Sequence, residues 1–135
     1  MARLHVPPPP ARRRDAVRAD GDYGVSDRPD WRDVDWPAHL KTIEIGGTAV
    51  NYVDVGEQGD HRPIVFVHGL SGQWQNWLEN IPRFAEQRRV VALDLPGFGV
   101  SPMPGARITI DLYGRIVAGL WHRLELAPAV LLGNS

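Results

Sequence analysis

Three short apolar runs constrain the fold of this chain more than any other feature of its sequence. They cover residues 64–67, 90–93 and 129–132, and the segments between them carry helical or turn-forming patterns. Continuous apolar runs of this length are typical of strands that are covered on both faces. They therefore predict parallel strands in one sheet, joined by crossover helices.

A β-hairpin is predicted ahead of these runs. Residues 41–45 alternate polar and apolar side chains, Gly46 and Gly47 suit a tight turn, and residues 48–55 continue as a second strand. The predicted order is hairpin, strand, helix, strand, helix, strand. This order indicates an α/β fold in which an antiparallel hairpin leads into a parallel sheet.

The segments between the runs predict helices. Pro82 cannot donate to a helix that passes through it, so we expect a short helix or turn around Trp74 and Trp77, and a second helix that begins near Asn80. The two tryptophans either pack in the core or line a ligand pocket. A longer helix follows Thr109, a possible N-cap. Its expected apolar stripe consists of Ile110, Tyr113, Val117, Leu120 and Leu124.

The first 30 residues differ in composition from the rest. They contain four consecutive prolines at 7–10, three arginines at 12–14, and alternating Arg and Asp. Few of these residues could enter a core, so we predict a disordered Pro/Arg-rich tail over residues 1–30 and one partial domain over residues 31–135. The tail lacks the apolar stretch of about 7–15 residues that a secretory signal needs, and we expect a cytoplasmic protein.

Composition excludes several classes of function. The formal net charge is −1, which predicts no binding to nucleic acid or to an anionic membrane. The apolar runs fall far short of the roughly 20 residues that span a bilayer. The chain has no cysteine, and no two histidines have the spacing of zinc ligands, so we expect neither a metal site nor a cofactor. The oligomeric state stays open.

Three glycine-containing clusters follow the three runs, at residues 68–72 (HGLSG), 94–101 (DLPGFGVS) and 133–135 (GNS). Chemistry in α/β sheets gathers at the carboxyl ends of parallel strands. Glycines there allow tight turns and leave amide N–H groups free to face a developing negative charge. Gly97 and Gly99 belong to no complete phosphate-binding motif, so we interpret them as a structural turn.

The ordered set of clusters resembles the α/β-hydrolase superfamily, over about residues 40–135. Members of this family carry a G-x-S-x-G elbow, in which a strand turns sharply into a helix and presents a nucleophilic serine. Residues 133–135 match the first half of that motif. The resemblance implies a truncated α/β-hydrolase fold, the N-terminal half, that stops at the nucleophile. It also implies that the strands before HGLSG and before GNS lie side by side.

The resemblance also implies a role for each cluster. Ser135 would attack a carbonyl carbon and form an acyl-enzyme that water hydrolyses. The backbone N–H of Leu70 would form one half of the oxyanion hole, and position 136 the other half. His68 and Gly69 would shape the oxyanion loop. Asp94 would anchor its turn and would not be the triad acid.

Triad order in this fold is serine, then Asp or Glu, then His, so we expect the acid and the base after Ser135. The chain as given is therefore expected to be inactive, and the full protein to act on a small-molecule ester or amide. The dehalogenase and epoxide-hydrolase branches of the family use aspartate as nucleophile, which argues against them here. The alternatives are an acyltransferase, a cofactor-free haloperoxidase, or a non-enzymatic remnant that binds a partner.

Overall fold

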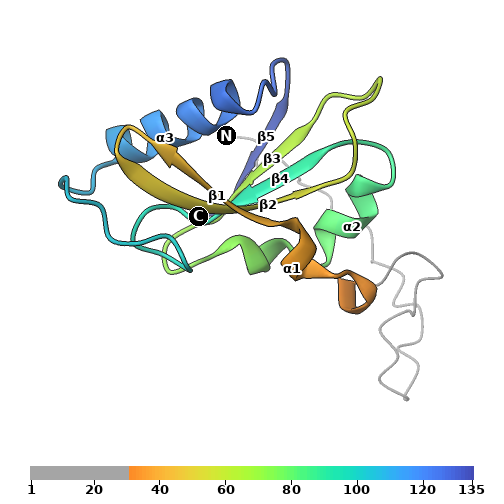
Figure 1. Ribbon diagram of the computed structural model, residues 1–135, viewed down its shortest axis with the longest axis horizontal. Helices are drawn as coiled ribbons and strands as arrows, with labels where there is room; N and C mark the ends of the chain where they lie inside the picture. The colour runs from red at the N-terminus through yellow and green to blue at the C-terminus, as the bar shows by residue number, and fades with distance from the viewer. Residues whose placement is uncertain (1–30) are drawn as a thin grey trace, which may run out of the picture.

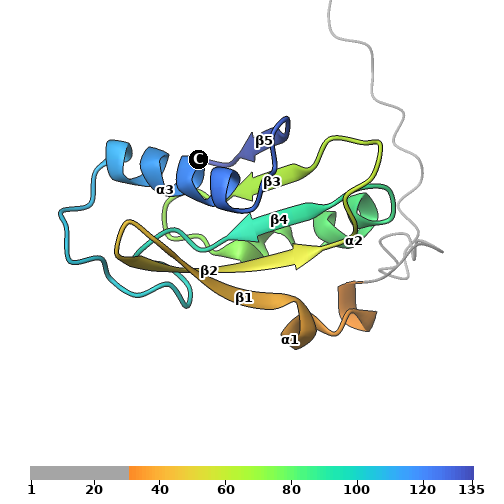
Figure 2. The ribbon, with the colours of Figure 1, turned by 45° about the horizontal axis from the view of Figure 1, so that its top comes forward.

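The computed structural model describes residues 31–135, and the disordered tail predicted for residues 1–30 lies outside this part. The described residues form a five-stranded mixed sheet with the strand order β1-β2-β4-β3-β5 (Figure 2). The predicted α/β fold class is confirmed. The strands are β1 (Leu40–Ile45), β2 (Thr48–Val55), β3 (Ile64–Val67), β4 (Val90–Leu93) and β5 (Val130–Gly133). The helices are the 3₁₀ turns η1 (Trp31–Asp33) and η2 (Trp74–Trp77), and α1 (Trp36–His39), α2 (Asn80–Ala85) and α3 (Ile110–Arg123).

Strand pairing follows the expected pattern. β1 and β2 form the antiparallel hairpin, and β2 pairs with β4 in the antiparallel sense. β3 lies between β4 and β5 and is parallel to both, so Val65 pairs with Val91 on one side and Leu131 on the other. The predicted adjacency of the strands before HGLSG and GNS is confirmed. The carboxyl ends of β3, β4 and β5 therefore lie side by side at one end of the sheet.

Helices cover both faces of the sheet (Figure 1). On one face, α3 packs over a core that includes Tyr52, Val65 and Leu93. On the other face, η2 and α2 cover a second core that includes Phe66. Trp74 is buried there, and Trp77 stacks on Phe66 with ring centroids 4.5 Å apart. Trp74 therefore belongs to this core, and Trp77 packs against it.

Helix α3 begins where the sequence predicts, because the Thr109 hydroxyl accepts a hydrogen bond of 3.0 Å from the Leu112 N–H. The predicted apolar stripe is partly wrong. Leu112, Ile116 and Leu120 are the buried residues of the helix, whereas Ile110 is 84% exposed. Residues four apart lie on one helical face, so both this stripe and the expected one satisfy the same period. Four members of the expected stripe still face the core: Leu120 is buried, and Tyr113, Val117 and Leu124 pack against it. Ile110 is the member that does not, and Leu112 and Ile116 are buried instead.

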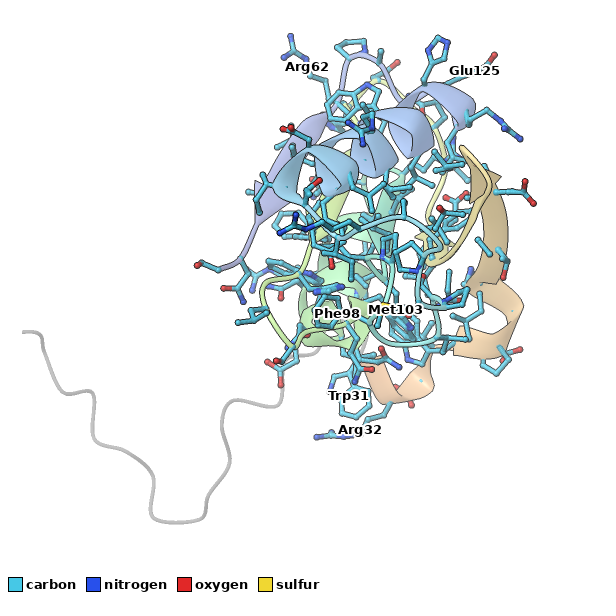
Figure 3. All side chains as sticks on the ribbon, turned by 90° about the vertical axis from the view of Figure 1, so that its left-hand side faces the viewer. Trp31, Arg32, Arg62, Phe98, Met103 and Glu125 are labelled. Carbon is cyan, nitrogen blue, oxygen red and sulfur yellow. The ribbon has the colours of Figure 1, made fainter. Side chains whose placement is uncertain are left out.

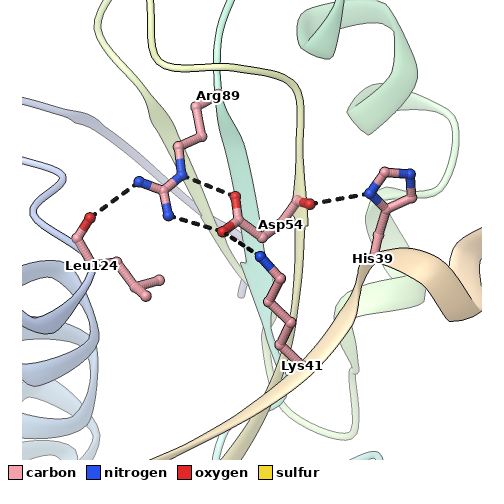
Figure 4. Close-up of polar contacts among 5 residues, drawn as sticks. All are labelled: His39, Lys41, Asp54, Arg89 and Leu124. Atoms are coloured by element: carbon pink, nitrogen blue, oxygen red, sulfur yellow. Dashed lines mark hydrogen bonds and ion pairs between the residues drawn. The ribbon is translucent and has the colours of Figure 1, made fainter.

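An ion-pair cluster joins β1 and β2 to the residues just before β4 and just after α3, at the end of the sheet opposite the carboxyl ends of the parallel strands (Figure 4). The Arg89 guanidinium donates to both Asp54 carboxylate oxygens at 2.9 and 2.8 Å, and to the Leu124 carbonyl oxygen at 3.1 Å. Lys41 lies 3.3 Å from the same carboxylate. Burial would raise the pKa of Asp54, but the hydrogen bonds and charges of Arg89 and Lys41 outweigh it, and the pKa lies below its usual value.

We predict that Arg89→Ala lowers the free energy of unfolding by about 2–3 kcal/mol, because it leaves a buried carboxylate without its bidentate partner. The control Lys41→Ala removes an exposed partner of the same carboxylate and should cost less than about 0.5 kcal/mol. Because the folded pKa of Asp54 is lowered, its contribution is present above the unfolded value of about 3.9 and is lost as the pH falls through the folded value. Urea denaturation between about pH 7 and pH 2 measures both effects. Equal losses for the two variants would contradict this assignment.

Strand β5 lies at the edge of the sheet and pairs with β3 alone among the described residues. Its side chains are exposed, including Leu131 at 51%. An apolar groove of about 890 Å³ separates it from α3 and is lined by Val117, Trp121 and Leu131, among others. An apolar edge with unpaired N–H and C=O groups is a template for association.

No helix within residues 31–135 is long and apolar enough to cross a bilayer.

We predict that the polypeptide 1–135 self-associates through β5. Leu131→Lys should raise its dissociation constant by about tenfold, equivalent to about 1.4 kcal/mol, because a lysine on an edge strand opposes pairing. Met103→Lys adds the same charge at an exposed loop position and should change association far less. Analytical ultracentrifugation measures the difference. A monomeric wild-type chain with a sharp cooperative melt would overturn the prediction.

Candidate active site

The three glycine-containing clusters meet at the shared edge of β3, β4 and β5. They border a cavity of about 450 Å³, within the usual range of roughly 300–1,000 Å³ for small-molecule sites. The loop after β3 contributes His68, Gly69 and Leu70; the loops after β4 and β5 contribute Leu95, Phe98, Asn134 and Ser135; and Ile108, Ile110 and Tyr113 complete the lining. Parallel strands thus bring together residues 67 positions apart in the sequence, such as His68 and Ser135.

His68 is buried and lines this cavity, and both of its ring nitrogens are hydrogen-bonded. The Leu95 N–H donates to Nε2 at 3.0 Å, which requires the proton to be on Nδ1. Nδ1 in turn donates to the Gly69 carbonyl oxygen at 2.8 Å. These bonds connect the loops after β3 and β4, and they leave the ring no free nitrogen to accept a proton from Ser135.

Gly69 brings the loop after β3 into direct contact with the nucleophile candidate. A Cβ atom at this position would lie 2.5 Å from the Ser135 carbonyl carbon and 2.9 Å from its Cα. Only a residue without a side chain allows this approach. The Asn134 N–H donates to the Val67 carbonyl oxygen at 3.0 Å and continues the β3–β5 ladder up to the site.

Leu70 lies at the start of a turn closed by a hydrogen bond of 3.0 Å from the Gly72 N–H to the Gly69 carbonyl oxygen. Ser71 has a φ of 60° in this turn, a left-handed conformation that costs a non-glycine residue about 1 kcal/mol or more. The Leu70 side chain is 88% exposed. Its backbone N–H donates no hydrogen bond within residues 31–135, so it is free to face a ligand.

Asp94 is completely buried and joins three parts of the chain. One carboxylate oxygen accepts from the Trp74 N–H at 2.7 Å. The other accepts from the Asn51 side-chain amide at 2.8 Å and from the Val100 N–H at 2.9 Å. The Ser101 hydroxyl donates to the Asp94 carbonyl oxygen at 2.7 Å and accepts from the Asn51 N–H at 2.8 Å. This carboxylate therefore holds its own turn, η2 and β2 together.

The glycines of the second cluster fit around this carboxylate. Gly99 has a φ of 53°, and a Cβ there would lie 2.3 Å from the Asp94 carboxylate. Gly97 has a φ of 86°, and a Cβ there would meet Met103 and Ile108 at 3.2–3.4 Å. Both glycines therefore occupy a turn whose shape depends on them.

The other described histidines lie away from Ser135. His39 approaches the Asp54 carbonyl oxygen at the opposite edge of the sheet, His61 is exposed in a loop, and His122 lines the groove between α3 and β5. Within the part of the chain that the structure describes, no three His, Asp or Glu side chains form a group that could hold a metal ion.

Sequence reasoning missed the roles of two groups of residues. Asn51 and Ser101 complete the Asp94 network, and no local pattern marks a partner 43 residues away. Phe98 and Tyr113 line the cavity beside Ser135. The Tyr113 hydroxyl donates to the Pro96 carbonyl oxygen at 3.2 Å, and burial raises the pKa of this phenol. The position of Phe98 between two glycines was a signal that could have identified it.

We predict that Asp94→Asn lowers the free energy of unfolding by about 2–3 kcal/mol, because its amide group places donors opposite N–H donors in a dry site. The control Asp60→Asn makes the same change in an exposed loop and should stay within about 0.5 kcal/mol. Thermal or urea denaturation measures both. If Asp94→Asn were as stable as the control, the carboxylate would not hold these loops together.

Comparison with known proteins places this geometry in a family. Residues 62–135 match the family described as the alpha/beta hydrolase fold. The dihydrolipoyllysine-residue acetyltransferase component of the acetoin cleaving system of Pseudomonas putida is 41% identical over 99 residues, which cover 73% of this chain and 26% of that protein. The 2-hydroxy-6-oxo-2,4-heptadienoate hydrolase of Pseudomonas putida is 38% identical over 100 residues, covering 70% of this chain and 35% of the relative.

Solved structures agree with this placement. The enol-lactonase from Burkholderia xenovorans LB400 superimposes with a TM-score of 0.66 at 28% identity, covering 70% of this chain and 37% of that one. The chain thus spans about a quarter to a third of the length of the curated relatives named above. Several relatives are hydrolases, including epoxide hydrolase 4 of Mus musculus at 38% identity over 96 residues. The chain belongs to the alpha/beta hydrolase family.

Proposed function

We propose that residues 31–135 form the N-terminal part of a serine hydrolase that cleaves a small-molecule ester, or an amide, through an acyl-enzyme at Ser135. The observation that carries the proposal is the contact between the two loops: Ser135 lies at the carboxyl end of β5, packed against Gly69, and both line the same cavity as Leu70. A nucleophile beside an unpaired backbone N–H is the arrangement that acyl transfer requires.

The proposed reaction has two steps. The Ser135 Oγ attacks the carbonyl carbon while a base removes its proton, and the carbonyl oxygen becomes an oxyanion that the Leu70 N–H stabilises. The C–O or C–N bond then breaks, the leaving group takes the proton, and an ester of Ser135 remains. Water, deprotonated by the same base, attacks this ester and releases the carboxylic acid and Ser135.

The general base must come from outside the described residues. His68 has both nitrogens engaged, and the other described histidines lie away from the cavity. Chain order in this fold puts the acid and the base after the nucleophile. We therefore propose that the polypeptide 1–135 is inactive by itself. The cytoplasmic location, the haloperoxidase alternative and the partner-binding alternative stay predictions of the sequence.

Acyl transfer is the second candidate, favoured by the 41% identity to an acetyltransferase component. The two functions share Ser135 and the acyl-enzyme and differ in the acceptor, which is water in hydrolysis and an alcohol, amine or thiol in transfer. Turnover of p-nitrophenyl acetate with and without an added thiol separates them. An acetyl thioester product would favour the transferase, and acetate alone the hydrolase.

We predict that Ser135→Ala, made in the complete protein that carries these residues, lowers kcat for p-nitrophenyl esters by about 10³-fold or more, because the acyl-enzyme cannot form. A fluorophosphonate probe should label the wild-type peptide that contains Ser135 and should not label the variant. An unchanged melting temperature shows that the fold is intact. Full activity of Ser135→Ala, or robust turnover by the polypeptide 1–135, would overturn the proposal.

A further inference from the structure

The turn after β4 holds Phe98 in a fixed position beside the cavity. Its N–H donates to the Leu95 carbonyl oxygen at 2.9 Å, and its carbonyl oxygen accepts from the Ser101 N–H at 3.0 Å. The positive φ angles of Gly97 and Gly99 bracket the residue on both sides. This part of the turn thus carries one large side chain, and both backbone polar groups of Phe98 are hydrogen-bonded.

The Phe98 ring packs between two residues of the cavity lining. Its centroid lies 5.5 Å from the His68 ring in an edge-to-face arrangement and 6.4 Å from the Tyr113 ring. The ring is half-buried, and the loop that carries it and Met103 faces the viewer in Figure 3. Phe98 therefore connects the His68 loop, on β3, to helix α3.

The rest of this wall is apolar as well. Leu95, Ile108 and Ile110 line the cavity together with Phe98 and Tyr113, and the Tyr113 hydroxyl is already bonded to the Pro96 carbonyl oxygen. No lining side chain within residues 31–135 carries a formal charge. A charged group placed against this wall would lose its hydration without gaining an oppositely charged partner, whereas each buried methylene gains about 0.8 kcal/mol.

We propose that this cavity receives an uncharged, apolar acyl group of the substrate and that Phe98 sets how long this group can be. The inference rests on the proposed function, because it requires the scissile carbonyl to lie at Ser135. The acyl group stays bonded to Ser135 through both chemical steps, whereas the leaving group departs after the first. A wall that is fixed to β4 and α3 is therefore suited to bind the acyl group.

The test compares p-nitrophenyl esters on the complete protein that carries these residues. Wild type should hydrolyse the butyrate ester with a kcat/KM at least about tenfold above that for the hemisuccinate, which has the same number of acyl carbons and a terminal carboxylate. Phe98→Ala should raise the ratio of kcat/KM for octanoate over butyrate by about tenfold, and Phe98→Trp should lower it. Val100→Ala, on the same loop but 72% exposed and outside the cavity lining, should leave the ratio unchanged.

The outcomes separate the two proposals. If no ester is hydrolysed, or if Ser135→Ala keeps full activity, the proposed function fails. If esters are hydrolysed through Ser135 but the hemisuccinate equals the butyrate, or the ratio moves in neither Phe98 variant, the acyl-group inference is wrong and the function stands. The opposite directions expected for the smaller and the larger side chain exclude a general loss of stability as the cause.

Discussion

The end of the sheet that carries the candidate active site depends on one buried carboxylate, that of Asp94. Burying an ion is costly unless its oxygens are hydrogen-bonded, and Asp94 meets that condition with two backbone N–H groups and one side-chain amide. These donors come from η2, from the turn after β4 and from β2. The requirement to satisfy the charge therefore fixes the three segments relative to one another. The turn that carries Phe98 begins at Asp94, and the loop that carries Leu70 ends at Trp74, whose N–H donates to Asp94.

The opposite end of the sheet is held by a second acidic residue, Asp54 of β2. β2 contributes Asn51 to the Asp94 network and Asp54 to the pair with Arg89. Arg89 also donates to the carbonyl oxygen of Leu124, just after the end of α3, while Thr109 caps the start of that helix. α3 is thus fixed at both ends, and it supplies Ile110 and Tyr113 to the cavity. β2 and α3 therefore connect the Asp54–Arg89 pair at one end of the sheet with the cavity at the other end.

Local patterns in the sequence were enough to predict the strands, the start of α3 and the convergence of the three clusters. Convergence follows from topology alone, because the carboxyl ends of adjacent parallel strands share an edge. The centre of the buried face of α3 could not be predicted, since Leu112 and Ile116 have the same period as Tyr113 and Val117, and only the angle of the helix on the sheet makes the first pair buried and the second pair partly buried. The Asn51 partner of Asp94 could not be predicted either, because the pairing of its strand, β2, with β4 is set by the tertiary structure and not by a local pattern.

The described residues of the site can position a substrate, but they offer no free group for proton transfer. Every described group near Ser135 that could exchange a proton is already bonded: His68 at both nitrogens and Tyr113 through its hydroxyl. The groups left free include a serine hydroxyl, one backbone N–H, the Asn134 amide and an apolar wall. Such a set can position a carbonyl and the group attached to it, but it cannot activate the nucleophile. Under the proposed function, residues 31–135 therefore determine which acyl group is accepted, and the residues that supply the base determine how fast it reacts and which acceptor receives it.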